Sequence, residues 1–173
     1  LVKSEAGNGR LGNGRWLIAE AAESDASFLH LQPHIAVVTN IDTDHMATYG
    51  GDFGQLTDTF LKFLHNLPFY GLAVLCSDDT VIRDLRPHIR RPVVTYGVEP
   101  EADYQAIDIR QHGTRMQFAV ALMDRSVIEV DLALPGLHNV RNAVAAIAVA
   151  DKVGIAPDSI VKGLRNFGGI GRR

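Results

Sequence analysis

The stretch Glu20–His45 reads E-A-A-E-S-D-A-S-F-L-H-L-Q-P-H-I-A-V-V-T-N-I-D-T-D-H and decides the expected fold. The apolar run from Ile35 leads directly into T-N-I-D-T-D-H, and Trp16–Ala19 leads in the same way into Glu20. An unbroken apolar run of this kind is typical of a parallel strand covered on both faces. In open α/β sheets, ligands sit at the carboxyl ends of the strands. The stretch therefore predicts a ligand-binding sheet edge formed by two strands, Trp16–Glu20 and Ile35–Asn40.

The residues that follow alternate between helical and strand patterns. Asp52 is the expected N-cap of an amphipathic helix that stops at Pro68, and Leu72–Cys76 is a third buried strand. Asp78 and Asp79 are expected to cap a shorter helix. This alternation indicates right-handed crossovers on a parallel sheet.

The second half of the chain has a different pattern. Four short strand candidates separated by turn signals are Val93–Tyr96, Tyr104–Ile109, Met116–Leu122 and Val127–Leu132. They predict a small antiparallel sheet, followed by a helix over His138–Lys152 and a last helix that opens at Pro157. We expect one α/β domain with a mostly parallel sheet flanked by helices and a small antiparallel sub-sheet.

Composition narrows the class of protein. The chain has 173 residues, of which 46% are apolar, and its formal charge of −3 argues against a nucleic-acid or anionic-membrane partner. No apolar stretch reaches the roughly 20 residues that a membrane-spanning helix needs. The single Cys76 fits a reducing, cytosolic compartment. Because the chain opens at Leu1 without a methionine and stops at Arg173, we expect it to be a piece of a longer protein.

One glycine-rich motif matches a dinucleotide-binding pattern but lies in the wrong structural context. Gly7, Gly9 and Gly12 satisfy G-x-G-x-x-G, but that fingerprint follows a strand and opens a helix, whereas these glycines precede a strand pattern. The repeated Asn-Gly pairs favour a turn instead.

Candidate ligands gather after the two leading strands. Glu20 is a carboxylate at a strand end, and D-T-D-H places Asp42, Asp44 and His45 together. Mg²⁺ prefers oxygen donors with several waters retained, whereas a histidine in the shell favours Mn²⁺. The alternatives are a solvated strand end for Glu20 and turn or cap roles for the aspartates.

A second group of candidates opens the helix at His138. Asn139 and Asn142 either cap and flank that helix start or bind a ligand. Arg172 and Arg173 either form a charged end of the chain or clamp a phosphate, because the planar fork of arginine suits phosphoryl oxygens.

Five motifs together carry a family resemblance. They closely resemble the UDP-N-acetylmuramate–L-alanine ligases, the first amino-acid-adding Mur ligases of bacterial peptidoglycan synthesis. The motifs are E-A-A-E-S-D-A-S-F-L-H-L-Q-P, T-N-I-D-T-D-H-M, F-L-H-N-L-P-F-Y-G, P-G-L-H-N-V-R-N-A and G-G-I-G-R-R.

The resemblance implies a domain and a reaction. Residues 1–173 would be the central, P-loop-type ATP-binding domain of a cytoplasmic bacterial enzyme, between a domain that holds the UDP-sugar and one that closes over ATP and the amino acid. The lactyl carboxylate of UDP-N-acetylmuramate attacks the γ-phosphate to give an acyl phosphate, and the amine of L-alanine then displaces phosphate.

The resemblance also implies roles for particular residues, with ATP and Mg²⁺ (or Mn²⁺) as cofactors. Near the phosphates, Glu20 would be a metal ligand and Arg173 would reach the phosphoryl oxygens. His45 would ligate a second metal or contact the reacting carboxylate, and Asn40 would lie beside it on the substrate. The adenine pocket would be lined by His138, Asn139 and Asn142.

Three departures from the family pattern bear on activity. Ala22 stands where the family usually has Asp, and Phe60 stands near the position of the carbamylated lysine of other Mur ligases. The G-T-H-G-K-T phosphate loop is expected upstream of Leu1. The chain alone is therefore expected to fold but not to catalyse, and to bind ATP weakly.

Three alternatives remain beside this interpretation. The first is the related murein-peptide-recycling ligase, and the second is a non-catalytic α/β binding module. The third is a metal-dependent hydrolase that uses Glu20, Asp44 and His45.

Overall fold

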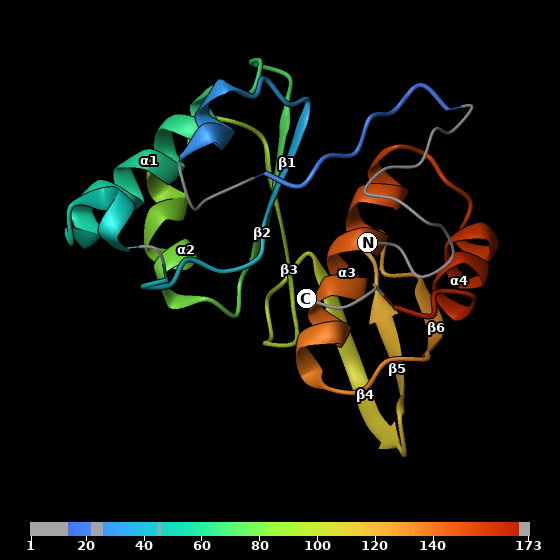
Figure 1. Cartoon of the computed structure of the whole chain (residues 1–173). Helices are drawn as coiled ribbons and strands as arrows, with labels where there is room; N and C mark the ends of the chain where they lie inside the picture. The colour runs from blue at the N-terminus through green and yellow to red at the C-terminus, as the bar shows by residue number, and fades with distance from the viewer. Residues whose placement is uncertain (1–13, 22–25, 45, 170–173) are drawn as a thin grey trace.

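The fold is built on one six-stranded mixed sheet, seen nearly edge-on in the computed structural model of Figure 1. The structure describes residues 14–21, 26–44 and 46–169. The strands lie side by side in chain order, β1-β2-β3-β4-β5-β6. The first four are mutually parallel, and β4, β5 and β6 are joined antiparallel. The expected α/β fold with an antiparallel part is confirmed, but the antiparallel strands extend the same sheet. The Val93–Tyr96 strand, which was predicted to lie in the antiparallel part, pairs in parallel with both of its neighbours.

The parallel half consists of β1 (Ile35–Val38), β2 (Leu72–Cys76) and β3 (Val93–Gly97). Helices α1 (Phe53–His65) and α2 (Thr80–Leu85) connect them. Both helices lie on one side of these strands, and α3 lies on the other (Figure 1). Covered on both faces, β2 and β3 are almost entirely buried, as their apolar sequences predict.

Helix α1 follows the predicted pattern closely. The side chain of Asp52 accepts a hydrogen bond from the backbone N–H of Gly54 at 2.8 Å and so caps the first turn. The helix ends at His65, three residues before Pro68. Its buried apolar face consists of Leu56, Phe60, Phe63 and Leu64.

The antiparallel half consists of β4 (Tyr104–His112), β5 (Arg115–Ala121) and β6 (Val127–Leu132). On β6, buried residues alternate with more exposed ones, because helices cover one face of this part of the sheet. Those helices are α3 (Leu137–Lys152) and α4 (Pro157–Arg165), and α4 packs on β6.

Short 3₁₀ helices complete the described elements: η1 (Ser27–His30), η2 (Met46–Tyr49) and η3 (Arg86–His88). No helix among the described residues is both long and apolar enough to cross a bilayer.

Two predictions about the leading strands are wrong. Residues 16–20 form no strand and are exposed, with 92% of Leu17 and of Ile18 accessible, because β1 pairs only with β2 among the described residues and offers them no ladder. An apolar run without a backbone partner is not a strand. The second predicted strand is present but ends at Val38 rather than Asn40. It is not covered on both faces, since 42% of Val37 is exposed, and the extensive contacts of α3 are with β2, β3 and β4. The glycines Gly7, Gly9 and Gly12 lie outside the described residues.

Candidate functional site at the carboxyl edge of the sheet

The loop after β1 is held by its own polar side chains. Asn40 donates from Nδ2 to Asp42 Oδ2 at 2.6 Å and accepts at Oδ1 from the Thr39 hydroxyl at 3.0 Å. Asp42 Oδ1 accepts from the backbone N–H of Asp44 at 3.0 Å, which is the turn role that aspartate often takes. All of these residues are exposed. The loop therefore presents an ordered group of oxygen donors and acceptors to solvent at the end of β1.

Asp79 fastens this loop to the neighbouring helix. Its Oδ1 accepts from the N–H of Ile82 at 2.9 Å, which confirms the predicted cap of α2. Its Oδ2 accepts from the N–H of Ile41 at 3.4 Å. One carboxylate thus joins the start of α2 to the segment after β1.

Asp78 does not cap α2, although the sequence predicted that it would. Its carboxylate turns toward the end of β3 and accepts from the N–H groups of Val98 and Glu99 at 3.0 Å. It also pairs with Nε of Arg141 on α3 at 2.5 Å, while only 4% of the Asp78 side chain is exposed. Sequence reasoning missed both partners because neither is close in the chain. A helix cap needs only one carboxylate. The presence of two adjacent aspartates was therefore the available signal that one of them has another partner.

Arg141, the partner of Asp78, lies near the start of α3. Gly136 precedes the helix at φ +95°, and no side chain caps the first turn. A Cβ at Gly136 would lie 2.8 Å from Cε1 of His138, so the imidazole lies against a position that only glycine fits. Asn139 is not the N-cap, since its amide donates to the carbonyl of Pro135 at 2.7 Å.

Two of the predicted adenine-binding residues remain accessible. His138 and Asn142 are exposed, stand four residues apart on α3 and so share one face of the helix. Neither side chain is hydrogen-bonded to another described residue. An imidazole and an amide with donor and acceptor atoms available can recognise a heteroaromatic edge.

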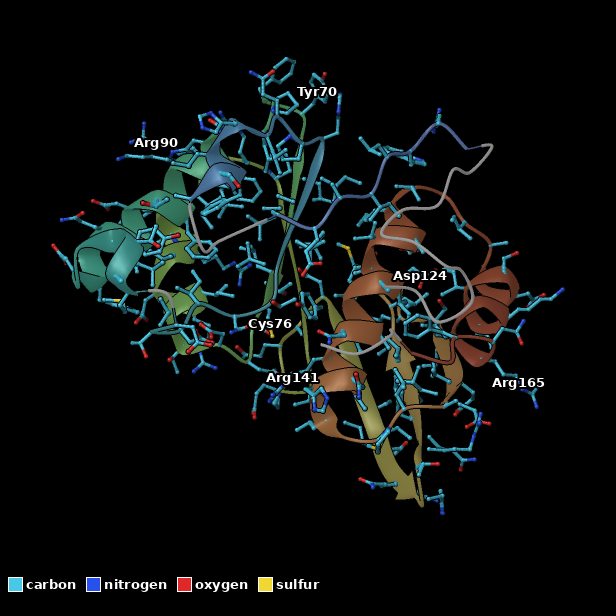
Figure 2. The ribbon with its side chains drawn as sticks, in the orientation of Figure 1. Tyr70, Cys76, Arg90, Asp124, Arg141 and Arg165 are labelled. Atoms are coloured by element: carbon cyan, nitrogen blue, oxygen red, sulfur yellow. The ribbon has the colours of Figure 1, made fainter. Side chains whose placement is uncertain are left out.

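Next to this edge of the sheet, β2 and β3 carry a thiol and a phenol that stay protonated at neutral pH. Burial raises the pKa of the Cys76 thiol, and burial together with the neighbouring Cys76 raises the pKa of the Tyr96 hydroxyl. Tyr96 donates to the carbonyl of Val38 at 3.4 Å. At neutral pH Cys76 is therefore a protonated, buried thiol and not a nucleophile. Figure 2 shows Cys76 and Arg141 near one end of the sheet and Tyr70 near the other.

The remaining predicted site residues are placed only in part. Glu20 is exposed in the extended segment 14–21, and its side chain or backbone interacts with a neighbouring group. His45 and Arg173 lie outside the described residues, as do Glu23, Asp25 and Arg172, so the predicted proximity of Glu20 and His45 stays a prediction.

The carboxylates at this edge of the sheet suit Mg²⁺ only in an open mode of binding. No group of three His, Cys, Asp or Glu side chains is arranged to hold a metal ion within residues 14–21, 26–44 and 46–169. Mg²⁺ at phosphate sites typically takes one or two carboxylates and keeps several waters. Exposed carboxylates such as Glu20, Asp42 and Asp44 fit that mode of binding, and they do not form a closed cage.

Comparison with solved structures finds the same fold in several ligases. A UDP-N-acetylmuramate–alanine ligase, MurC of Thermotoga maritima, is 27% identical with a TM-score of 0.74, over 87% of this chain and 33% of that one. A UDP-N-acetylmuramate:L-alanyl-γ-D-glutamyl-meso-diaminopimelate ligase of Neisseria meningitides is 28% identical with a TM-score of 0.71, over 84% and 43%. MurF of Acinetobacter baumannii is 26% identical with a TM-score of 0.72, over 84% and 32%.

The chain spans about a third of the length of the MurC and MurF structures that it matches. The family model of the Mur ligase middle domain matches residues 15–150, which include β1 to β6 and most of α3. The chain therefore belongs to the Mur ligase middle domain family, and Mur ligases are ATP-dependent amide-bond ligases.

Proposed function

We propose that this chain is the ATP-binding middle domain of a ligase that joins L-alanine to UDP-N-acetylmuramate through an acyl phosphate. The observation that carries the proposal is the shared edge: Asp79 holds the Asn40 loop and Asp78 holds the start of α3, so both predicted regions border one part of the molecule. A MurF ligase of Thermotoga maritima with this fold, 20% identical, was solved in complex with ADP.

In this proposal the start of α3 binds the adenine. The amide of Asn142 offers the donor and acceptor that match the N6/N7 edge of adenine, and the ring of His138 lies beside it. Asn139 contributes its remaining acceptor oxygen, since its N–H₂ group already donates to Pro135.

The phosphate and substrate end lies at the loop after β1. Asn40 orients the lactyl carboxylate, and Glu20 and His45 hold the metal shell and the reacting group, with Arg173 on the phosphoryl oxygens. Mg²⁺ or Mn²⁺, when bound there, neutralises charge on the transferring phosphoryl group. Asp42, which fixes the Asn40 amide at 2.6 Å, pre-orients that side chain.

The test is ATP-dependent phosphate release by the full-length protein with each acceptor. We expect release that requires UDP-N-acetylmuramate and is stimulated by L-alanine, with UDP-N-acetylmuramoyl-L-alanine as the product by mass spectrometry. Stimulation by the tripeptide L-alanyl-γ-D-glutamyl-meso-diaminopimelate in place of L-alanine would assign the recycling activity instead. No release with either acceptor would favour a non-catalytic module.

A further inference from the structure

The buried Asp78 carboxylate accepts hydrogen bonds from several groups that lie on different elements. Segments from three elements reach it: the strand end after β2 that carries it, the two N–H groups that follow β3, and Arg141 of α3. A carboxylate that is 4% exposed needs such partners, because an unpaired buried charge costs several kcal/mol. Its partners are therefore held in fixed positions relative to one another.

The close approach at this point depends on Gly97. A Cβ at Gly97 would lie 2.2 Å from Asp78 Oδ1 and 2.8 Å from Ser77 Oγ. The carboxylate thus occupies the volume that a side chain at the end of β3 would fill. The sequence places glycine at the one residue where the carboxylate passes the strand end.

Through Arg141, the fixed position of the Asp78 carboxylate holds the face of α3 that carries His138 and Asn142. It stands three residues after His138 and directly before Asn142, so its side chain fixes the rotation of the first two turns about the helix axis. The Arg141 side chain is 36% exposed, which places it at the border between the core and the site. No side-chain cap holds this helix start in place, so the ion pair is its main polar tether to the sheet.

We propose that Asp78 and Arg141 are positioning residues of the nucleotide site. Their ion pair sets the distance and rotation of the α3 start against the carboxyl edge of β2 and β3, and thereby aims His138 and Asn142 at the purine. The inference rests on the proposed function, because it assigns that face of α3 to adenine. It adds a pair of residues that act through Asn142 and do not touch the nucleotide.

The test compares Arg141→Ala with Arg110→Ala in the full-length protein. Arg110 is an exposed β4 residue whose side chain has no hydrogen bond to another described residue, so it controls for loss of a surface arginine. We expect Arg141→Ala to raise the KM for ATP about tenfold and to lower the preference for ATP over GTP, with the KM for the UDP-sugar changed less than about twofold. Arg141→Lys, which keeps the charge but not the planar fork, should fall between wild type and Arg141→Ala.

A double-mutant cycle separates positioning from a general effect on stability. If Arg141 acts through Asn142, Arg141→Ala should add little to the ATP KM once Asn142→Ala is present. Additive effects, or an Arg141→Ala enzyme that loses melting temperature with an unchanged ATP/GTP ratio, would overturn the proposal. If Asn142→Ala alone leaves the ATP KM and the base preference unchanged, the adenine assignment itself is wrong, and the positioning proposal is overturned with it.

Discussion

Adjacent side chains of the same type do different work at the end of β2. Asp79 satisfies backbone N–H groups of α2 and of the loop after β1, whereas Asp78 crosses to β3 and α3. A helix cap needs only one acceptor, and Asp79 provides it for α2. The Asp78 carboxylate can therefore reach the end of β3, the parallel strand next to β2. The packing around Asp78 can be tested at Gly97, whose missing Cβ makes room for it.

We expect Gly97→Ala to destabilise the protein by about 1–3 kcal/mol, because the new methyl group would displace the Asp78 carboxylate from its amide and guanidinium partners. Urea unfolding followed by circular dichroism measures the change. Gly163→Ala is the matched control: nothing lies within 4 Å of a Cβ at that position in α4, so alanine should raise stability by up to about 1 kcal/mol. Equal effects of the two substitutions would show that the approach of Asp78 to Gly97 carries no strain.

At the scale of elements, the cap of α1 offers an isolated test. Asp52 accepts from Gly54 N at 2.8 Å, and its side chain makes no other hydrogen bond among the described residues, so Asp52→Ala should cost about 0.5–2 kcal/mol. Asp58→Ala, at an exposed position in the middle of the same helix, should be neutral or slightly stabilising. A thermal unfolding series would contradict the capping role if the two variants melted together.

The elements themselves were largely predictable, because each has a local signal. Leu72–Cys76 is a continuous apolar run, and Asp52 and Pro157 mark helix starts, so β2, α1 and α4 were assigned correctly. The Trp16–Glu20 strand was wrong because strand formation depends on a neighbouring backbone, which composition does not reveal.

For the candidate site, the motif names His138 and Asn142, and their role in binding adenine stays a prediction. The partners of Asp78 were not predicted, because they are 20 to 63 residues away in the chain. Such contacts depend on sheet order and on which face α3 covers, and a single sequence carries no direct record of either.

At the scale of the whole molecule, the core keeps three weakly acidic side chains in their protonated, neutral form. Cys76, Tyr96 and Tyr104 are buried in or beside the sheet, and burial raises the pKa of each. Tyr104 also donates to Asp151 Oδ2 at 2.5 Å, and this hydrogen bond raises its pKa further. All three groups must stay protonated for the core to remain closed.

The sign of the pH effect follows from these shifts. A group whose folded pKa is raised binds its proton more tightly in the folded state, so its contribution is complete below the unfolded pKa and is lost as the pH rises above it. The unfolded values are about 8.5 for cysteine and about 10 for tyrosine. We therefore expect the free energy of unfolding to fall progressively above about pH 9, with the steeper loss above pH 10.

Tyr104→Phe isolates one part of this loss. At pH 7 the variant should be less stable than wild type by about 1.5–3 kcal/mol, since the hydrogen bond to a carboxylate is removed while the ring stays in place. Above pH 10 the difference should shrink, because phenylalanine has no proton to lose and the wild-type protein alone is penalised. Tyr70→Phe is the control, because the Tyr70 side chain is 62% exposed and should change neither the stability nor its pH slope. Urea unfolding from pH 7 to pH 11 gives both quantities, and parallel curves for wild type and Tyr104→Phe would mean that Tyr104 does not titrate with unfolding in this range.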